Sequence, residues 1–213
     1  MSKLIFVSIS LVAATAIAKP NTGEVKGTIK IKNKKDAKSV VVYLENVPGD
    51  PPKMKNAVIK QREKQFEPPL TIVVRGTTVD FPNEDKIFHN VFSVSRPARF
   101  DLGLYKSGTM KSVEMKRPGV VDVYCNIHPD MIAKVKVLDN GFYTVTAADG
   151  KFDIQGVPAG EYPIVAWLPS GGEATGKVTI KPGEAASVDL EVTEVVTKTT
   201  HTRKDGTPYG RYK

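Results

Sequence analysis

Cysteine, histidine and tryptophan are scarce in this chain of 213 residues, which holds one Cys, three His and one Trp. A single thiol excludes an internal disulfide, and the absence of a C-x-x-C-H motif excludes covalently attached c-type haem. No stretch beyond the first 20 residues approaches the roughly 20 apolar residues that a membrane-spanning helix needs. The sequence therefore predicts no transmembrane segment.

The first 18 residues, MSKLIFVSISLVAATAIA, combine one positive charge at Lys3, an apolar run and small residues at Ala16 and Ala18. This pattern is typical of a secretory signal peptide, and it predicts cleavage after Ala18 and a periplasmic or secreted protein. In such an oxidising compartment a lone cysteine is a buried bystander, a free reactive thiol or a metal ligand.

Positive charge exceeds negative charge, with 31 Lys and Arg against 23 Asp and Glu and a formal net charge of +8. The basic residues gather at 30–38, at 60–64 and in the C-terminal tail. These runs lack the interleaved aromatic residues of single-strand binders, so we expect no nucleic-acid partner. Most of these charges are expected on a solvated face, where they favour encounter with an acidic protein or an anionic surface.

Hydrophobic residues alternate with polar ones over many short runs, and almost no helical periodicity is present. Turn-forming stretches such as PGDPP, FPNED and RPG separate the runs. This pattern predicts antiparallel strands in an all-β sandwich or barrel. The runs cover residues 25–31, 39–47, 70–74, 77–81, 91–94, 120–125 and 133–137.

A second set of short strands follows the LDNG turn, with Phe142, Phe152, Tyr162 and Trp167 as expected core residues. A domain boundary is therefore predicted near Asn140. The expected organisation is a first β-sandwich with an N-terminal extension, a small second β-sandwich, and a flexible basic tail. The corresponding ranges are 19–139, 140–196 and 197–213.

The only thiol lies where a strand ends. Side chains alternate along a strand, so Val121, Val123 and Cys125 share one face, and the thiol lies at the edge of a hydrophobic core. His128 and Met131 follow within a loop that Pro129 stiffens.

A metal site built on Cys125, His128 and Met131 needs a second histidine as a further ligand. His89 opens a strand in the first set, whereas His201 belongs to the polar tail and is expected to be solvated. A thiolate, two imidazoles and a thioether form the donor set of electron-transfer copper sites, while zinc sites seldom use the thioether. The candidate ligands are His89, Cys125, His128 and Met131.

Two stretches, FEPPLTIVVRGTTVDFPNEDKIFHNVFSVS and PGVVDVYCNIHPDM, resemble the cupredoxins, the plastocyanin- and amicyanin-like blue copper proteins, over about residues 66–138. The resemblance implies a Greek-key β-sandwich with one copper ion held by those four ligands. It also implies that the side chain of Asn90 ties the two ligand loops together. The combination of HNVFS, FDLGLY and CNIHP is similar to a methylamine-utilization-like group.

The stretch ADGKFDIQGVPAGEY resembles carboxypeptidase-regulatory-like modules, which implies a small transthyretin-like sandwich without catalytic zinc. The cupredoxin resemblance implies a redox protein partner, such as a cytochrome or a dehydrogenase. Electrons would then pass through the exposed edge of His128, with an apolar docking collar formed by Phe88, Ile127 and Pro129.

Each of these residues has a simpler interpretation. Cysteine is often buried, so Cys125 alone is compatible with core packing. Met131 is compatible with space filling, with an oxygen in its place at the metal. No third orienting group or oxyanion pocket accompanies the Cys–His pair, so we expect no enzyme. The remaining hypotheses are an electron carrier, a copper-handling protein and a structural pair of sandwiches.

Overall fold

The computed structural model describes residues 21–195 and 201–209, so the predicted signal peptide, 1–18, lies outside the described residues. The described part is all-β and contains no helix. In it, no segment has the helical length and apolarity needed to cross a membrane. The strands are β1 (Thr22–Ile31), β2 (Val41–Leu44), β3 (Ala57–Val58), β4 (Lys60–Arg62), β5 (Gln65–Glu67), β6 (Leu70–Val74), β7 (Thr78–Pro82), β8 (His89–Ser93), β9 (Phe100–Tyr105), β10 (Met110–Glu114), β11 (Gly119–Tyr124), β12 (Ile132–Leu138), β13 (Tyr143–Val145), β14 (Lys151–Pro158), β15 (Gly160–Trp167), β16 (Glu173–Ile180), β17 (Ala185–Ser187) and β18 (Leu190–Val192).

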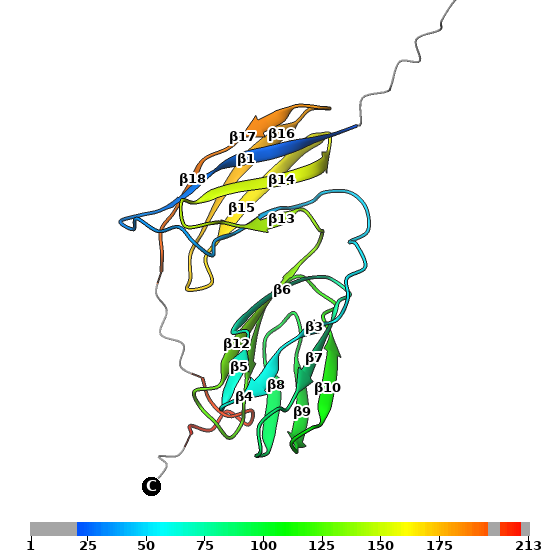
Figure 1. Ribbon diagram of the computed structural model, residues 1–213, viewed down its shortest axis with the longest axis vertical. Helices are drawn as coiled ribbons and strands as arrows, with labels where there is room; N and C mark the ends of the chain where they lie inside the picture. Colours follow the sequence, from blue (N-terminus) through cyan, green and yellow to red (C-terminus); the bar gives the residue numbers. More distant parts are fainter. Residues whose placement is uncertain (1–20, 196–200, 210–213) are drawn as a thin grey trace, which may run out of the picture.

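These strands form two β-sandwiches, one above the other in Figure 1. The upper one, called here the host sandwich, has one sheet in the order β14-β1-β17, with β18 also paired to β1. Its other sheet has the order β13-β2-β15-β16. The lower one, the inserted sandwich, contains β3 to β12.

The N-terminal strands correct the predicted domain organisation. β1 pairs antiparallel with β14, and β2 pairs antiparallel with β13 and β15. The residues expected as an extension of the first domain therefore complete the other one. β1 lies in the centre of a sheet whose other strands come more than a hundred residues later in the chain. The periodicity of a strand shows which of its faces is buried but does not show which distant strand it pairs with.

Parallel pairing is a second difference from the predicted antiparallel arrangement. β6 runs parallel to β12, β3 runs parallel to β7, and β17 and β18 run parallel to β1. Alternation along a strand reports which face is buried and not the direction of its neighbour.

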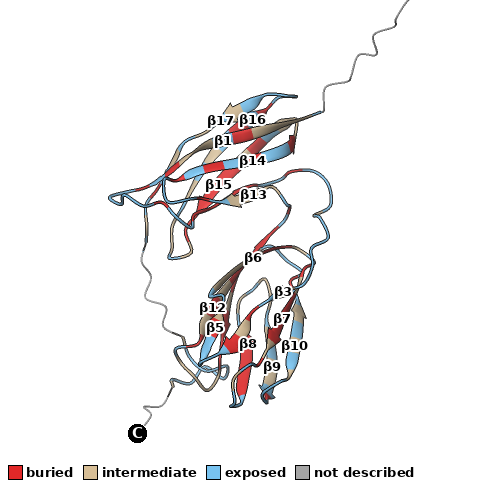
Figure 2. Ribbon diagram, viewed as in Figure 1, coloured by how far each residue is buried: buried red, intermediate tan, exposed pale blue. Residues whose placement is uncertain are grey.

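The inserted sandwich has a five-stranded sheet in the order β6-β12-β11-β8-β9 and a three-stranded sheet in the order β10-β7-β3. Its core includes Val121 and Val123, as their alternation predicts, together with Phe81, which is fully buried. Figure 2 shows β8 buried along its length, in agreement with its five buried residues. This strand carries His89 into the interior.

The two sandwiches meet at an aromatic cluster around a buried lysine. Trp167, expected in the core of the second domain, lies here with Tyr43 and Leu138. Lys136 on β12 is 7% exposed, and its Nζ lies 4.7 Å from the Tyr43 ring centre and 4.9 Å from that of Trp167. The same Nζ donates a hydrogen bond to Tyr43 Oη at 3.1 Å. The ammonium thus joins the sandwiches through cation–π contacts.

Replacing Lys136 by Met is expected to flatten the pH dependence of stability on the alkaline side. Burial lowers the pKa of Lys136, despite the opposing influence of Glu173 and Glu45. The unfolded chain then keeps the lysine proton at pH values where the folded chain has lost it. The free energy of unfolding of the native protein therefore rises with pH until the pH reaches the ordinary lysine pKa of about 10.4. Urea titrations of both proteins at pH 7 and pH 10 measure the difference. If the free energy of unfolding changed equally between pH 7 and pH 10 in both proteins, Lys136 would not be the group with the lowered pKa.

Candidate metal centre

Neighbouring strands bring two sequence-predicted residues together. His89 is the first residue of β8, and Cys125 follows the last residue of β11. These two strands pair through Tyr124 and Phe92, so both side chains lie at the same region of one sheet. Both His89 and Cys125 are fully buried. His128, three residues after Cys125, is half-buried and reaches the same place from the following loop.

The donor atoms of these residues face one another across short distances. Cys125 Sγ lies 3.9 Å from His89 Nδ1 and 3.6 Å from His128 Nδ1, and the two Nδ1 atoms are 3.0 Å apart. The point equidistant from the corners of this triangle lies about 2.1 Å from each atom. This distance matches a zinc–imidazole bond of about 2.0–2.1 Å and is slightly shorter than a zinc–thiolate bond of about 2.3 Å. In the described part of the chain these residues form a group suited to a metal ion. His89, Cys125 and His128 are therefore the residues that would hold a metal ion here.

The surroundings of Cys125 favour its thiolate. Burial alone raises the pKa of the thiol, but the His89 ring and three backbone N–H groups outweigh burial and hold the pKa below its ordinary value. These N–H groups belong to Asn90, Ile127 and His128. A deprotonated sulfur is the form that binds a metal.

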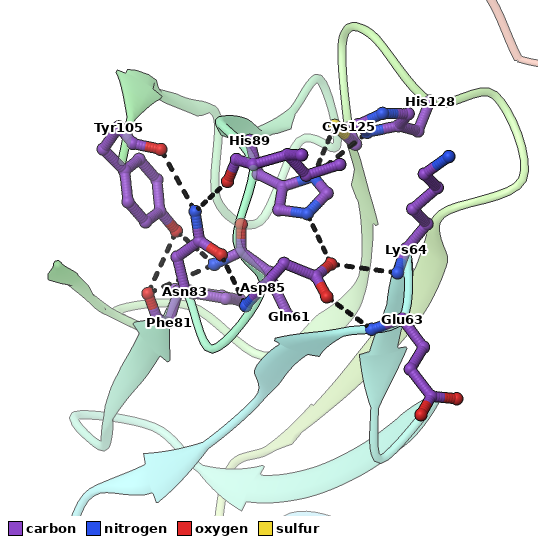
Figure 3. A network of polar contacts seen from close by, with 11 residues as sticks. Gln61, Glu63, Lys64, Phe81, Asn83, Asp85, His89, Tyr105, Cys125 and His128 are labelled. Carbon is purple, nitrogen blue, oxygen red and sulfur yellow. Dashed lines mark hydrogen bonds and ion pairs between the residues drawn. The ribbon is translucent and has the colours of Figure 1, made fainter. Parts of the chain in front are cut away.

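The His89 ring is fixed from behind by a carboxylate, as Figure 3 shows. Its Nε2 lies 2.7 Å from Asp85 Oδ2, which leaves Nδ1 to face the sulfur. Asp85 is itself held by the backbone N–H groups of Glu63 at 2.7 Å and Lys64 at 2.9 Å. A carboxylate on the far nitrogen of a histidine sets its tautomer and ring orientation.

The pKa values of this pair move apart. Burial disfavours the charged form of Asp85, but the Lys64 amide, the His89 ring and the Glu63 amide outweigh it and lower the pKa. Burial likewise lowers the pKa of His89, but Cys125 and Asp85 outweigh it and raise the pKa. For His128, burial and the nearby His89 both lower the pKa. His128 therefore favours the neutral imidazole, the form that binds a metal.

A buried polar network supports the loop that carries Asp85. Asn83 accepts a hydrogen bond at Oδ1 from the Asp85 backbone N–H and donates from Nδ2 to the carbonyl oxygens of Ile87 and Tyr105. Gln61 donates to Tyr105 Oη at 2.6 Å, and this hydroxyl donates to the carbonyl oxygen of Phe81. Asp85 was not among the predicted site residues, although it ends the FPNED turn, four residues before His89.

Met131 is fully buried in the core of the inserted sandwich beside Cys125. Its carbonyl oxygen accepts a hydrogen bond from the Cys125 N–H at 3.3 Å, and its own N–H donates to the His128 carbonyl oxygen at 3.2 Å. The loop between Cys125 and Met131 is thus closed on itself by backbone bonds. Axial ligation by the Met131 thioether stays a prediction.

Asn90 has a different partner from the one implied by the family resemblance. Its Nδ2 donates to Asp101 Oδ1 on β9 at 2.7 Å, and not to the second ligand loop. Its contribution to Cys125 comes from the backbone N–H. The side chain points along the sheet because β9 pairs directly with β8. The expected tie between the ligand loops is therefore not made by this side chain.

The residues predicted to form an apolar collar differ in exposure. Phe88 is 53% exposed and Ile87 beside it is 40% exposed, whereas Ile127 and Pro129 are half-buried. Exposed Lys86 adjoins this pair in the chain. An apolar surface with a basic neighbour adjoins His89.

The C-terminal segment corrects the expectation of a free tail. His201 stacks on Tyr124 with ring centres 4.1 Å apart, and its Nε2 lies 2.7 Å from the Pro129 carbonyl oxygen. Tyr209 Oη donates to the Cys125 carbonyl oxygen at 2.6 Å. The apolar-poor composition of this segment indicated solvation because it contains no hydrophobic run, but its contacts are aromatic stacking and hydrogen bonds.

Solved structures similar to this chain include variants of amicyanin and a copper-containing nitrite reductase. A reduced tryptophan-to-tyrosine variant of amicyanin is 24% identical, with 45% of this chain and 97% of that chain covered and a TM-score of 0.37. An oxidised proline-to-alanine variant of amicyanin is 25% identical over the same shares, also with a TM-score of 0.37. The copper-containing nitrite reductase of Thermus scotoductus SA-01 is 23% identical, with 45% of this chain and 28% of that chain covered and a TM-score of 0.39.

No protein-family model matches the chain, and no curated protein matches it. TM-scores below 0.5 do not by themselves establish a shared fold.

Proposed function

We propose that this protein is a type 1 copper protein that carries single electrons between redox partners outside the cytoplasm. The observation that carries the proposal is the triangle of Cys125 Sγ and the Nδ1 atoms of His89 and His128, with a point about 2.1 Å from all three atoms. Two imidazoles and one thiolate in a plane are the donors of electron-transfer copper sites. We assign Met131 as the weak axial donor.

The chain's own groups suit this role. When bound, copper supplies a one-electron couple between Cu(I) and Cu(II). Asp85 holds the His89 ring, and the backbone N–H groups around Cys125 favour its thiolate, so both donors are set before the metal arrives. The buried residues Val121 and Val123 exclude water from the sulfur side. Fixed donors leave little to rearrange when the charge of the ion changes.

The surface beside the site suits a partner that docks and dissociates. We propose Phe88, Ile127 and Pro129, joined by exposed Ile87, as the apolar contact, with the ring edge of His128 as the exit for the electron. The net charge of +8 favours an acidic redox protein, such as a cytochrome or a dehydrogenase, because opposite charge accelerates encounter. We further propose a carboxypeptidase-regulatory-like role for the host sandwich and secretion through the signal peptide over 1–18.

The decisive experiment is a visible absorption spectrum of the protein after addition of one equivalent of Cu(II). The proposal predicts an intense thiolate-to-copper charge-transfer band that ascorbate bleaches and an oxidant restores. Loosely held copper with a weak band would support copper handling instead. A protein that binds no copper would leave a structural role for the two sandwiches.

Replacing Met131 by Leu is expected to keep the intense band and to raise the reduction potential, because the axial donor that favours Cu(II) is removed. Voltammetry of the copper-loaded protein measures the potential. Met115→Leu is the matched control, since Met115 is also fully buried in the same core. Equal potentials in the two variants would show that Met131 is not bound to the metal.

A further inference from the structure

Residues 201–209 form hydrogen bonds to the loop that carries Cys125 and His128. Three hydrogen bonds reach this loop: Tyr209 Oη donates to the Cys125 carbonyl oxygen at 2.6 Å, the Lys204 N–H donates to Asn126 Oδ1 at 2.9 Å, and His201 Nε2 meets the Pro129 carbonyl oxygen at 2.7 Å. The contacts are spread from the first ligand of the loop to the residue after His128. They restrain most of the loop between Cys125 and Met131.

Aromatic contacts hold the segment itself in place. The His201 ring stacks on Tyr124, the residue before Cys125, with an interplanar angle of 15°. Tyr209 meets the edge of His201 with ring centres 5.0 Å apart, and its hydroxyl lies 3.3 Å from His201 Nδ1. The two ends of the segment therefore close on each other over the strand that leads into the site.

The same segment connects the two ligand-bearing parts of the inserted sandwich. Lys204 Nζ lies 2.6 Å from Asp101 Oδ2, and the other oxygen of Asp101 accepts from Asn90, the neighbour of His89. The backbone N–H of Lys204 binds Asn126, the neighbour of Cys125. A single residue of the segment thus bridges the first ligand strand and the second ligand loop. This is the link that the Asn90 side chain was expected to make.

The segment belongs to the part of the chain that follows the host sandwich. Val195 donates to the Gly171 carbonyl oxygen in that sandwich, whereas His201 lies against the ligand loop of the inserted one. In Figure 1 the red segment lies beside the lower end of the inserted sandwich. Residues 201–209 therefore follow the host sandwich in the chain but lie against the candidate metal site of the inserted sandwich.

We propose that residues 201–209 act as a strap that positions the metal-binding loop. The strap fixes the backbone at Cys125, Asn126 and Pro129, so the loop keeps one conformation whether or not a metal is bound. Its consequence for copper, slower release from the loop, rests on the function proposed above. The positioning itself does not require a metal.

Amide hydrogen exchange of the metal-free, full-length protein tests the strap. Tyr209→Phe keeps the ring and removes the hydroxyl that binds the Cys125 carbonyl oxygen. We expect the loop amides of Cys125 and Met131 to exchange about fivefold faster, the effect of losing one ordinary hydrogen bond. His201→Ala removes both the stacking and the Pro129 contact and is expected to accelerate the same amides further.

Tyr162→Phe is the matched control, because it removes a tyrosine hydroxyl that lies 3.4 Å from a carbonyl oxygen in the host sandwich. It is expected to leave the loop amides unchanged. Unchanged loop exchange in both strap variants would overturn the proposal. Transfer of copper to a chelator is the second measurement, with faster release expected from both strap variants. Faster exchange in a protein that binds no copper would support the strap and reject the proposed function.

Discussion

Cys125→Ser is expected to abolish the intense visible band of the copper-loaded protein. The band requires charge transfer from a thiolate, and a serine hydroxyl is neither soft nor ionised at neutral pH. Copper affinity is expected to fall by more than the about 10–100-fold that the loss of an outer partner costs, because a direct donor is removed. The measurement is titration of the variant with Cu(II), followed by absorbance and by competition with a chelator.

Val123→Thr provides the matched control for this substitution. Val123 lies on β11 two residues before Cys125 and is fully buried in the same core, so the change inserts a hydroxyl there and leaves every proposed ligand in place. Both variants are expected to lose about 1–3 kcal/mol of stability from burial of a hydroxyl. Only Cys125→Ser is expected to lose the band. A serine variant that stayed blue would refute the ligand assignment.

Gly27→Ala is expected to destabilise the host sandwich by more than about 3 kcal/mol and to leave the metal site intact. A Cβ at this position would lie 1.7 Å from the Val188 carbonyl oxygen and 2.9 Å from the Phe152 ring. The obstructing atom is backbone, so β1 has to move away from the chain that packs against it. The parallel pairing of β1 with β17, whose residue Ser187 lies opposite Lys26, would be lost.

Two signals distinguish the sandwiches in this experiment. Trp167, the only tryptophan, reports on the host sandwich by fluorescence, and the copper band reports on the inserted one. In a denaturant titration, the fluorescence transition of Gly27→Ala is expected at a much lower denaturant concentration than that of the native protein. The midpoint of the copper-band transition is expected to change little. Gly156→Ala in β14 is the control, since no atom lies within 4 Å of its Cβ and its φ of +69° costs only about 1–2 kcal/mol. If the copper-band midpoint of Gly27→Ala fell as far as the Trp167 fluorescence midpoint, the idea that the two sandwiches unfold separately would be wrong.

Local patterns predicted much of the fold. Alternation placed Val121, Val123 and Cys125 on one buried face, and the turn stretches FPNED and RPG lie at the end of β7 and the start of β11. Strand pairing between distant segments was not predictable in this way, because the partner of β1 depends on which sheet has a vacant position. The position of Trp167 at the junction of the sandwiches was missed for the same reason.

The candidate site shows the same limit. The spacing of Cys125 and His128 in one loop, with His89 at a strand start, indicated the cluster, and the structure brings their donor atoms within 3.9 Å of one another. The contacts around the cluster were less visible. Asp85 acts through a turn, and Tyr209 acts from the opposite end of the sequence, so neither has a periodic or compositional signature.

The insertion of one sandwich into the other also sets an order of folding. Strands β3 to β12 are contiguous in the chain, so their sandwich closes through comparatively short loops. The host sandwich has to join residues as far apart as Thr28 and Asp189, 161 positions along the chain, which raises its contact order. During synthesis the first strands are therefore expected to remain unpaired until their partners are made, while the inserted sandwich completes its core. The cluster of His89, Cys125 and His128 lies in the sandwich that is expected to close first, whereas residues 201–209 follow both sandwiches in the chain.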